Sequence, residues 1–124
     1  MSLEVFYQEI KGDYQTVYSR LHSEALIWRL VIKFLDDPSY ERLCNAIREE
    51  DYEAAFMAVH TLKGVCQNLN FQVLTESAGQ LTELLRNWAD KQVDKESCNI
   101  LLKQVENDYK MVVDAVRRLE EVRA

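Results

Sequence analysis

The sequence predicts an all-α fold, an up-down four-helix bundle with additional short N-terminal helices. Three observations carry this prediction. Apolar residues recur three and four positions apart along most of the chain, which is the period of an α-helix. Serine, aspartate or asparagine stands at the start of most of these periodic segments, where such residues cap helices. The chain has only one proline and three glycines, so little interrupts its regular elements.

The length indicates a single domain. A chain of 124 residues with 48% hydrophobic and 29% charged residues can enclose one core without help from metals or disulfides. No linker, internal repeat or low-complexity stretch divides it. We therefore expect one helical domain over residues 1–124, with the bundle core at about 13–122.

The first part of the chain predicts three helical segments. Ser2 can cap a short helix that ends near Gly12, and Asp13 can cap a second one. Ser23 can cap a third segment, which runs to about Asp36. The only proline of the chain follows and ends or kinks that segment.

The next two segments lead to the helix on which the functional argument depends. Ser39 restarts a helix, and Asp51 caps the segment after it. Asn70 stands where that segment would end in left-handed geometry, which asparagine tolerates. The apolar positions of this central helix are spaced three and four apart: Tyr52, Ala55, Val59, Leu62, Cys66 and Leu69.

Two further helices complete the expected bundle. One runs from about Phe71 to Asp90, and the last begins after a polar connection at residues 91–94. Amphipathic helices joined by short connections bury their apolar stripes against one another, and an up-down bundle is the simplest packing that does so. The stripe of the first helix is Leu74, Ala78, Leu81, Leu85 and Trp88, and that of the last is Cys98, Leu101, Val105, Tyr109, Val112, Val116 and Leu119.

Charge and cysteine content exclude several classes of protein. A net charge of −6 is the opposite of the basic face that nucleic-acid binding needs. No apolar run reaches the roughly 18 residues of a membrane span, and the N-terminus lacks the features of a secretory leader. We therefore expect a cytoplasmic protein that binds neither nucleic acid nor membrane. Cys44, Cys66 and Cys98 lie in apolar helical patterns and are expected to be small buried residues in a reducing compartment.

The sequence contains no motif for a nucleotide or a metal ion. Gly12, Gly64 and Gly79 are too scattered to form a phosphate-binding loop. The two histidines, His22 and His60, have no cysteine or histidine at ligand spacing. We therefore expect no cofactor, and we expect His22 to be an ordinary surface or cap residue.

A second, polar stripe runs along the central helix. On a helical wheel His60, Lys63, Gly64 and Gln67 lie together, roughly 120° from the apolar stripe. His60 is therefore expected to be exposed. An exposed imidazole is a nucleophile toward phosphorus, and an ammonium group one turn away can stabilise the charge that it acquires. A mid-helix glycine costs about 0.5–1 kcal/mol relative to alanine, and clearance for an incoming partner is one reason for Gly64.

The segment that begins at His60 resembles the pattern H-x-L-K-G-S/A-S/A-x-x-L-G of the histidine-containing phosphotransfer (HPt) domain family. Asn70 stands in place of the final glycine, and Val65 and Cys66 replace the two small residues. The resemblance extends over most of the chain, starting near Gly12. The positions that match the pattern are His60, Leu62, Lys63, Gly64 and Leu69.

The resemblance implies roles for particular residues. His60 would be the phospho-accepting residue, Lys63 and Gln67 would contact the phosphoryl group or the partner, and Gly64 would leave the approach open. Gln80, on the next helix, is a further candidate to face the site.

The resemblance also implies partners. These would be receiver domains of response regulators and of hybrid histidine kinases, with Mg²⁺ held by the receiver. The chain itself would be a monomeric phosphocarrier rather than an enzyme. An apolar docking patch beside His60 is expected to include Phe56 or Phe71.

Two other interpretations stay open. The chain could be a helical docking module that binds receiver domains or other helices without phosphotransfer, with His60 incidental. It could also be an enzyme, such as a phosphohistidine phosphatase or a helical hydrolase. The enzyme interpretation lacks support because no second catalytic base or metal site is apparent near His60.

Overall fold

The computed structural model describes residues 1–123, and the helices there account for all the regular structure. The all-α fold class is therefore confirmed. A short 3₁₀ helix, η1 (Phe34–Asp36), follows the third α-helix. The α-helices are α1 (Leu3–Glu9), α2 (Tyr14–Leu21), α3 (Glu24–Lys33), α4 (Ser39–Arg48), α5 (Tyr52–Asn68), α6 (Gln72–Leu85) and α7 (Lys95–Arg123).

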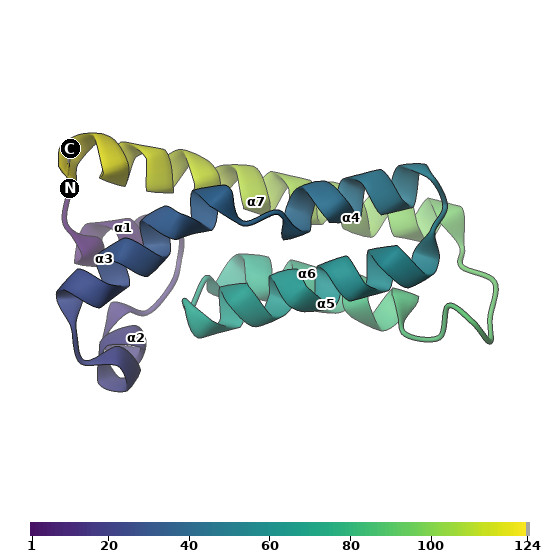
Figure 1. Cartoon of the computed structure of the whole chain (residues 1–124), viewed down its shortest axis with the longest axis horizontal. Helices are drawn as coiled ribbons and strands as arrows, with labels where there is room; N and C mark the ends of the chain where they lie inside the picture. The colour runs from purple at the N-terminus through teal and green to yellow at the C-terminus, as the bar shows by residue number, and fades with distance from the viewer. Residues whose placement is uncertain (124) are drawn as a thin grey trace.

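Helices α4, α5, α6 and α7 lie side by side and form the body of the molecule (Figure 1). Each packs against the next along the chain. Helix α3 continues α4 toward the end of the bundle where both termini lie, and α1 and α2 gather at that same end. None of the helices within residues 1–123 combines the length and the apolar character needed to cross a bilayer.

Side-chain caps begin four of the helices at the predicted residues. Each capping oxygen accepts a hydrogen bond from a backbone N–H of the first turn, where N–H groups lack partners within the helix. The N-cap residue of α4 is Pro38, which makes no side-chain cap, but the Asp37 carboxylate just before it accepts the Ser39 N–H at 2.9 Å. The predicted caps that the structure confirms are Ser2, Asp13, Ser23 and Asp51.

The prediction for the end of α6 is wrong. The helix ends at Leu85, and the chain turns from Arg86 to Asp90. The Trp88 N–H donates to the Leu85 carbonyl at 3.1 Å in this turn. Trp88 therefore leaves the apolar stripe of α6, and its side chain is 37% exposed rather than buried.

The prediction that Phe71 belongs to an exposed docking patch is also wrong. Phe71 stands just before α6 and is fully buried. Its ring packs edge-to-face against Phe34 at 5.1 Å and against Phe6 at 5.9 Å between ring centroids. The aromatic side chain fills the space between the N-terminal helices and the bundle, a position that the spacing of α6 residues alone does not indicate.

The C-terminal end of α5 is held by the N-terminal segment. The buried Tyr7 hydroxyl donates to the Leu69 carbonyl at 2.7 Å, and the side-chain oxygen of Asn70 accepts the Asp13 N–H at 2.8 Å. Burial raises the pKa of Tyr7 above its ordinary value, so the hydroxyl keeps the proton that it donates. Asn70 has a φ of 56°, which confirms the predicted left-handed position. These bonds tie α1 and α2 to the central helix.

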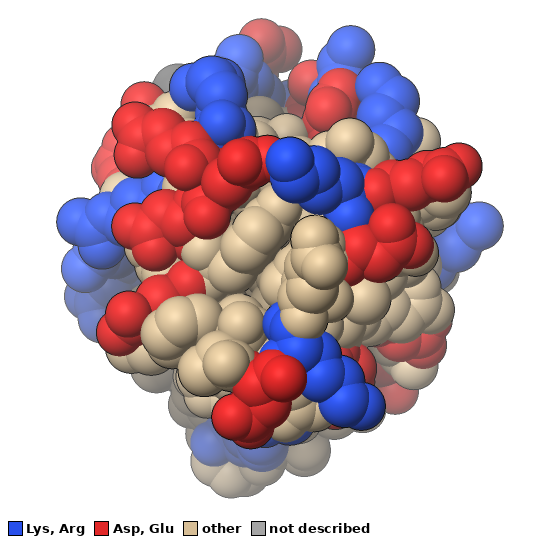
Figure 2. Space-filling model, turned by 90° about the vertical axis from the view of Figure 1, so that its right-hand side faces the viewer, with Lys and Arg blue, Asp and Glu red and all other residues tan. Residues whose placement is uncertain are grey.

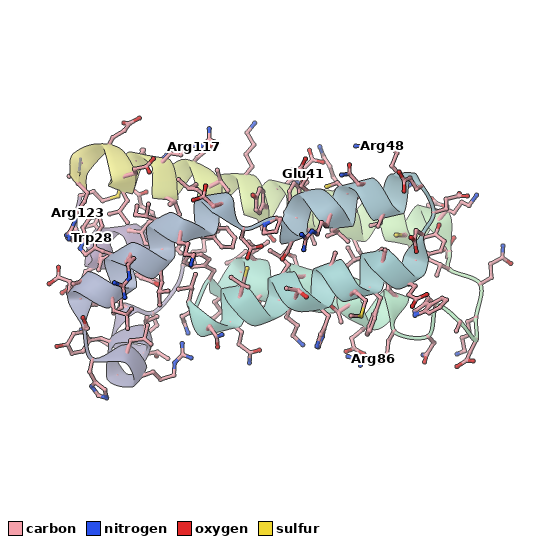
Figure 3. The ribbon with its side chains drawn as sticks, viewed as in Figure 1. Trp28, Glu41, Arg48, Arg86, Arg117 and Arg123 are labelled. Carbon is pink, nitrogen blue, oxygen red and sulfur yellow. The ribbon has the colours of Figure 1, made fainter. Side chains whose placement is uncertain are left out.

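The two ends of the bundle differ. At the end with both termini, the guanidinium of Arg123 on α7 lies 4.5 Å from the ring centroid of Trp28 on α3 (Figure 3). At the opposite end charges of both signs are interleaved around an uncharged centre (Figure 2). An exposed ion pair between Lys95 and Glu50, 2.5 Å apart, belongs to that end. Pairs of this kind contribute little to stability.

The close approach of the N-terminal segment to α5 makes Gly12 sensitive to substitution. A Cβ atom at Gly12 would lie 2.6 Å from the Asn70 carbonyl oxygen and 2.8 Å from a ring carbon of Tyr7. We expect Gly12→Ala to lower the free energy of unfolding by about 1–3 kcal/mol, measured by urea denaturation, because overpacking forces the backbone apart.

Gly64→Ala is the matched control for this substitution. A Cβ atom there meets nothing within 4 Å, and alanine favours a helix interior, so the free energy of unfolding should rise by about 0.5–1 kcal/mol. A Gly12→Ala variant as stable as wild type would contradict the close contact.

Candidate functional site on helix α5

Helix α5 divides into a buried face and a solvent face. Its fully buried side chains include Val59, Leu62 and Cys66, which pack into the core. His60 lies between them in sequence but is exposed, as the helical wheel predicted. Burial of the apolar stripe thus turns the imidazole outward on a helix of 17 residues with a capped start.

Lys63 lies one turn beyond His60 and crosses onto α6. A Cβ atom at Gly79 would lie 3.7 Å from the Lys63 Cε and 4.0 Å from its Nζ. The half-buried lysine stem therefore runs over the one α6 position that has no side chain. Sequence reasoning did not single out Gly79 for this purpose, although a second mid-helix glycine is itself a signal of close approach.

Gly64 leaves the surface open beside His60. The absence of any atom within 4 Å of a Cβ built at Gly64 shows that the surface there is not filled by another part of the described chain. Gly64 is exposed, like His60. The surface at Gly64 is open, and its use by an incoming partner stays a prediction.

An aromatic ring stacks on the imidazole. The rings of Phe56 and His60 are nearly parallel, with an interplanar angle of 14° and a centroid distance of 6.0 Å. The guanidinium carbon of Arg86 lies over the Phe56 ring, 5.8 Å from its centroid. Figure 3 shows Arg86 at the lower edge of the bundle, beside α5 and α6. The four-residue spacing of Phe56 and His60 was a signal for their contact.

Arg86 is held by an acidic partner on α6. Its Nε and one Nη donate to the two carboxylate oxygens of Glu83 at 3.1 and 2.7 Å. The hydrogen bonds from Arg86 are the main reason that the pKa of Glu83 is lowered, and the charge of Lys63 adds to the effect. Glu83 is exposed, so the pair serves to orient the guanidinium more than to stabilise the fold. The sequence analysis missed both residues.

The remaining candidates lie around this centre. Gln67 is exposed one turn beyond Lys63. Together with Asp13 and Thr16 it lines a shallow polar hollow of about 470 Å³ between α2 and the start of α6. Gln80 is exposed on α6 beside Gly79. An apolar group that the sequence analysis missed is Met57, whose side chain is 61% exposed one turn before His60.

The other titratable candidates stand apart from this centre. His22 is the left-handed C-cap of α2 and is exposed, as expected of a cap residue. Cys66 and Cys98 are buried and Cys44 is half-buried. Among residues 1–123 no three His, Cys, Asp or Glu side chains are close enough to hold a metal ion.

Comparison with known families gives one match, to the Hpt domain, over residues 35–121. The chain belongs to the Hpt domain family. The matched stretch holds α4 to α6 and all but the last two residues of α7, and therefore His60 and its neighbours, while α1 to α3 precede it. Searches of curated proteins and of solved structures returned no match. Hpt domains are phosphotransfer modules of two-component signalling, so the resemblance seen in the His60 motif is confirmed.

Because the Lys63 side chain lies over Gly79, a larger residue at position 79 should displace it. We expect Gly79→Leu to displace the ammonium. If Lys63 has the phosphoryl-stabilising role that the family resemblance implies, this variant should slow phosphoryl transfer about tenfold, as Lys63→Met would. The rates are measured with a phosphorylated receiver domain as donor.

Gly79→Ala is the control, since its methyl group would only touch the lysine stem at ordinary van der Waals distance. Equal rates for Gly79→Leu and Gly79→Ala would show that the position of the stem over α6 is unimportant.

Proposed function

We propose that this chain is a phosphocarrier in a multistep phosphorelay. It accepts a phosphoryl group on His60 from the aspartyl phosphate of one receiver domain and passes it to the aspartate of another. The observation that carries the proposal is the exposed imidazole with an ammonium one turn away, next to the open surface at Gly64.

The transfer step follows from these groups. An unprotonated ring nitrogen of His60 attacks phosphorus, an N–P bond forms, and the P–O bond to the receiver aspartate breaks. The bonding electron pair leaves with the aspartate carboxylate. The onward transfer is the reverse of this step with a second carboxylate as acceptor. Because the transition state is in line, catalysis depends mostly on positioning and on charge stabilisation.

The surrounding residues have separate tasks in this proposal. Lys63 stabilises the phosphoryl charge, and Gly64 lets the receiver approach. Gln67 and Gln80 contact the phosphoryl group or the partner from either side of the lysine. Met57 and Phe56 supply an apolar contact beside a polar reacting pair, which is the composition of a transient interface.

In this proposal the chain is a phosphocarrier and not an enzyme that turns over a substrate. The receiver supplies Mg²⁺, while this chain supplies a nucleophile on a rigid helix and needs no cofactor. We infer a cytoplasmic monomer that partners with receiver domains of response regulators and hybrid histidine kinases. For the body of the molecule we infer the up-down four-helix arrangement of α4 to α7.

A docking module without phosphotransfer is the second candidate. The exposed Met57, next to the half-buried Phe56, favours it because an apolar patch is what such a module would present. The two candidates differ in whether His60 carries phosphate.

Replacement of the histidine distinguishes the two candidates. After incubation with phosphorylated receiver domains, wild type should carry acid-labile, base-stable phosphate and His60→Gln should carry none. Mass spectrometry of the intact proteins measures this. His22→Gln is the matched control, because His22 is the other histidine of the chain and is also exposed, at the C-cap of α2, and it should be labelled like wild type. Label on neither wild type nor His22→Gln across a panel of receivers would favour the docking module.

The open surface at Gly64 predicts a steric effect that depends on the donor. Gly64→Leu should fold, since nothing lies within 4 Å of that position, but its side chain should slow transfer from a receiver domain roughly 10- to 100-fold by displacing the incoming carboxyl phosphate.

Phosphoramidate, a small donor that phosphorylates histidine directly, should label Gly64→Leu at nearly the wild-type rate. Unchanged transfer from the receiver would mean that no partner approaches over Gly64.

A further inference from the structure

A line of side chains connects α6 to the reactive imidazole. It runs from Glu83 on α6 through Arg86, the residue that follows the end of α6, to Phe56 and His60 on α5. The two carboxylate hydrogen bonds fix the guanidinium, the guanidinium lies over the phenyl ring, and that ring is stacked on the imidazole. Neither Arg86 nor Glu83 belongs to the motif that surrounds His60.

An exposed histidine on a helix needs a support to keep one orientation. Side chains occupy staggered χ1 wells, and the imidazole χ2 has about two broad positions, so a free ring divides its time among several orientations. Only some of them point a ring nitrogen toward an incoming phosphorus in line with the leaving oxygen. Lys63 does not supply this support, because its stem is turned onto α6.

Phe56 has the geometry of such a support. Its ring lies nearly parallel to the imidazole, at 14°, with the ring centroids 6.0 Å apart, and so flanks His60 on one side. The ring is itself half-buried rather than locked in the core, so it needs a contact on its exposed side. Arg86 provides that contact, and its planar fork is held in place by both oxygens of Glu83.

We propose that Phe56 and Arg86 are positioning residues for His60. Phe56 holds the imidazole in the orientation from which it attacks phosphorus, and Arg86, anchored by Glu83, holds Phe56. Neither residue touches the phosphoryl group. This inference rests on the proposed phosphocarrier function.

Two donors separate positioning from docking. Phosphoramidate reaches His60 without a protein interface, whereas a phosphorylated receiver domain must dock. A positioning role slows labelling by both donors, but a role in docking slows only the receiver. The rates are measured by mass spectrometry on Phe56→Leu and Arg86→Gln, and each variant is checked for wild-type helical content and urea midpoint.

The expected loss of labelling rate follows from the number of orientations that the His60 ring regains when its support is removed. Labelling of Phe56→Leu by phosphoramidate should fall roughly threefold to sixfold, because the imidazole regains its other χ1 and χ2 positions. The rate at which phosphoramidate labels Arg86→Gln should fall about twofold, since the phenyl ring stays in place but is held less firmly. Phe56→Tyr keeps an aromatic face and should restore most of the rate.

Arg48→Gln is the matched control for the arginine. Arg48 is exposed on α4 and donates to Asn45 three residues earlier at 2.9 Å, so it copies the local setting of Arg86 away from His60. Its rate should equal that of wild type. In NMR spectra, the ring-current shift of the His60 ring protons and their contacts to Phe56 should weaken in Arg86→Gln and stay unchanged in Arg48→Gln.

Each outcome is informative. Phosphoramidate rates of Phe56→Leu and Arg86→Gln equal to wild type would overturn the positioning role, even if transfer from the receiver is slower. A Phe56→Tyr variant as slow as Phe56→Leu would also overturn it, because the aromatic face would then be irrelevant. If wild type takes no phosphoryl group on His60 from either donor, the proposed function itself fails and the positioning role falls with it.

Discussion

The burial of one face of α5 against its neighbours is the constraint on which the site depends. Val59 and Leu62 are fully buried on that face, so His60 between them has to face solvent. The same burial raises the pKa of the Cys66 thiol, mainly through desolvation, and keeps it unreactive. The exposed imidazole is therefore the group on this helix that the proposed function uses as nucleophile.

The neighbours of α5 contribute more than an apolar surface. Helix α6 presents Gly79 under the stem of Lys63, and Arg86 at its end lies over Phe56. The residues that flank His60 one turn before and one turn after it on α5 are thus both contacted from this helix. At its far end α5 is tied to the N-terminal helices by the Tyr7 hydroxyl. His60 thus lies on a packed and anchored helix, which suits the alignment that the proposed transfer would require.

The errors in the sequence predictions have a common physical origin. The helix starts were correct at residues such as Asp51, because a cap acts on the turn that follows it. Trp88 was misplaced because its three- and four-residue spacing continues past Leu85, where the backbone has already turned away. Phe71 was misplaced because its burial depends on Phe6 and Phe34, which are distant in sequence. Periodicity identifies a helical face and does not show where that face stops.

The sequence by itself determined the all-helical fold class, the capped central helix and the outward direction of His60, because capping and the helical period act within a few residues. It also carried the Hpt motif. Only the tertiary structure decided that Lys63 rests on Gly79 and that Arg86 covers the ring stacked on His60. These contacts depend on how far α6 is shifted along α5, and that shift is set by the packing of side chains from separate parts of the chain.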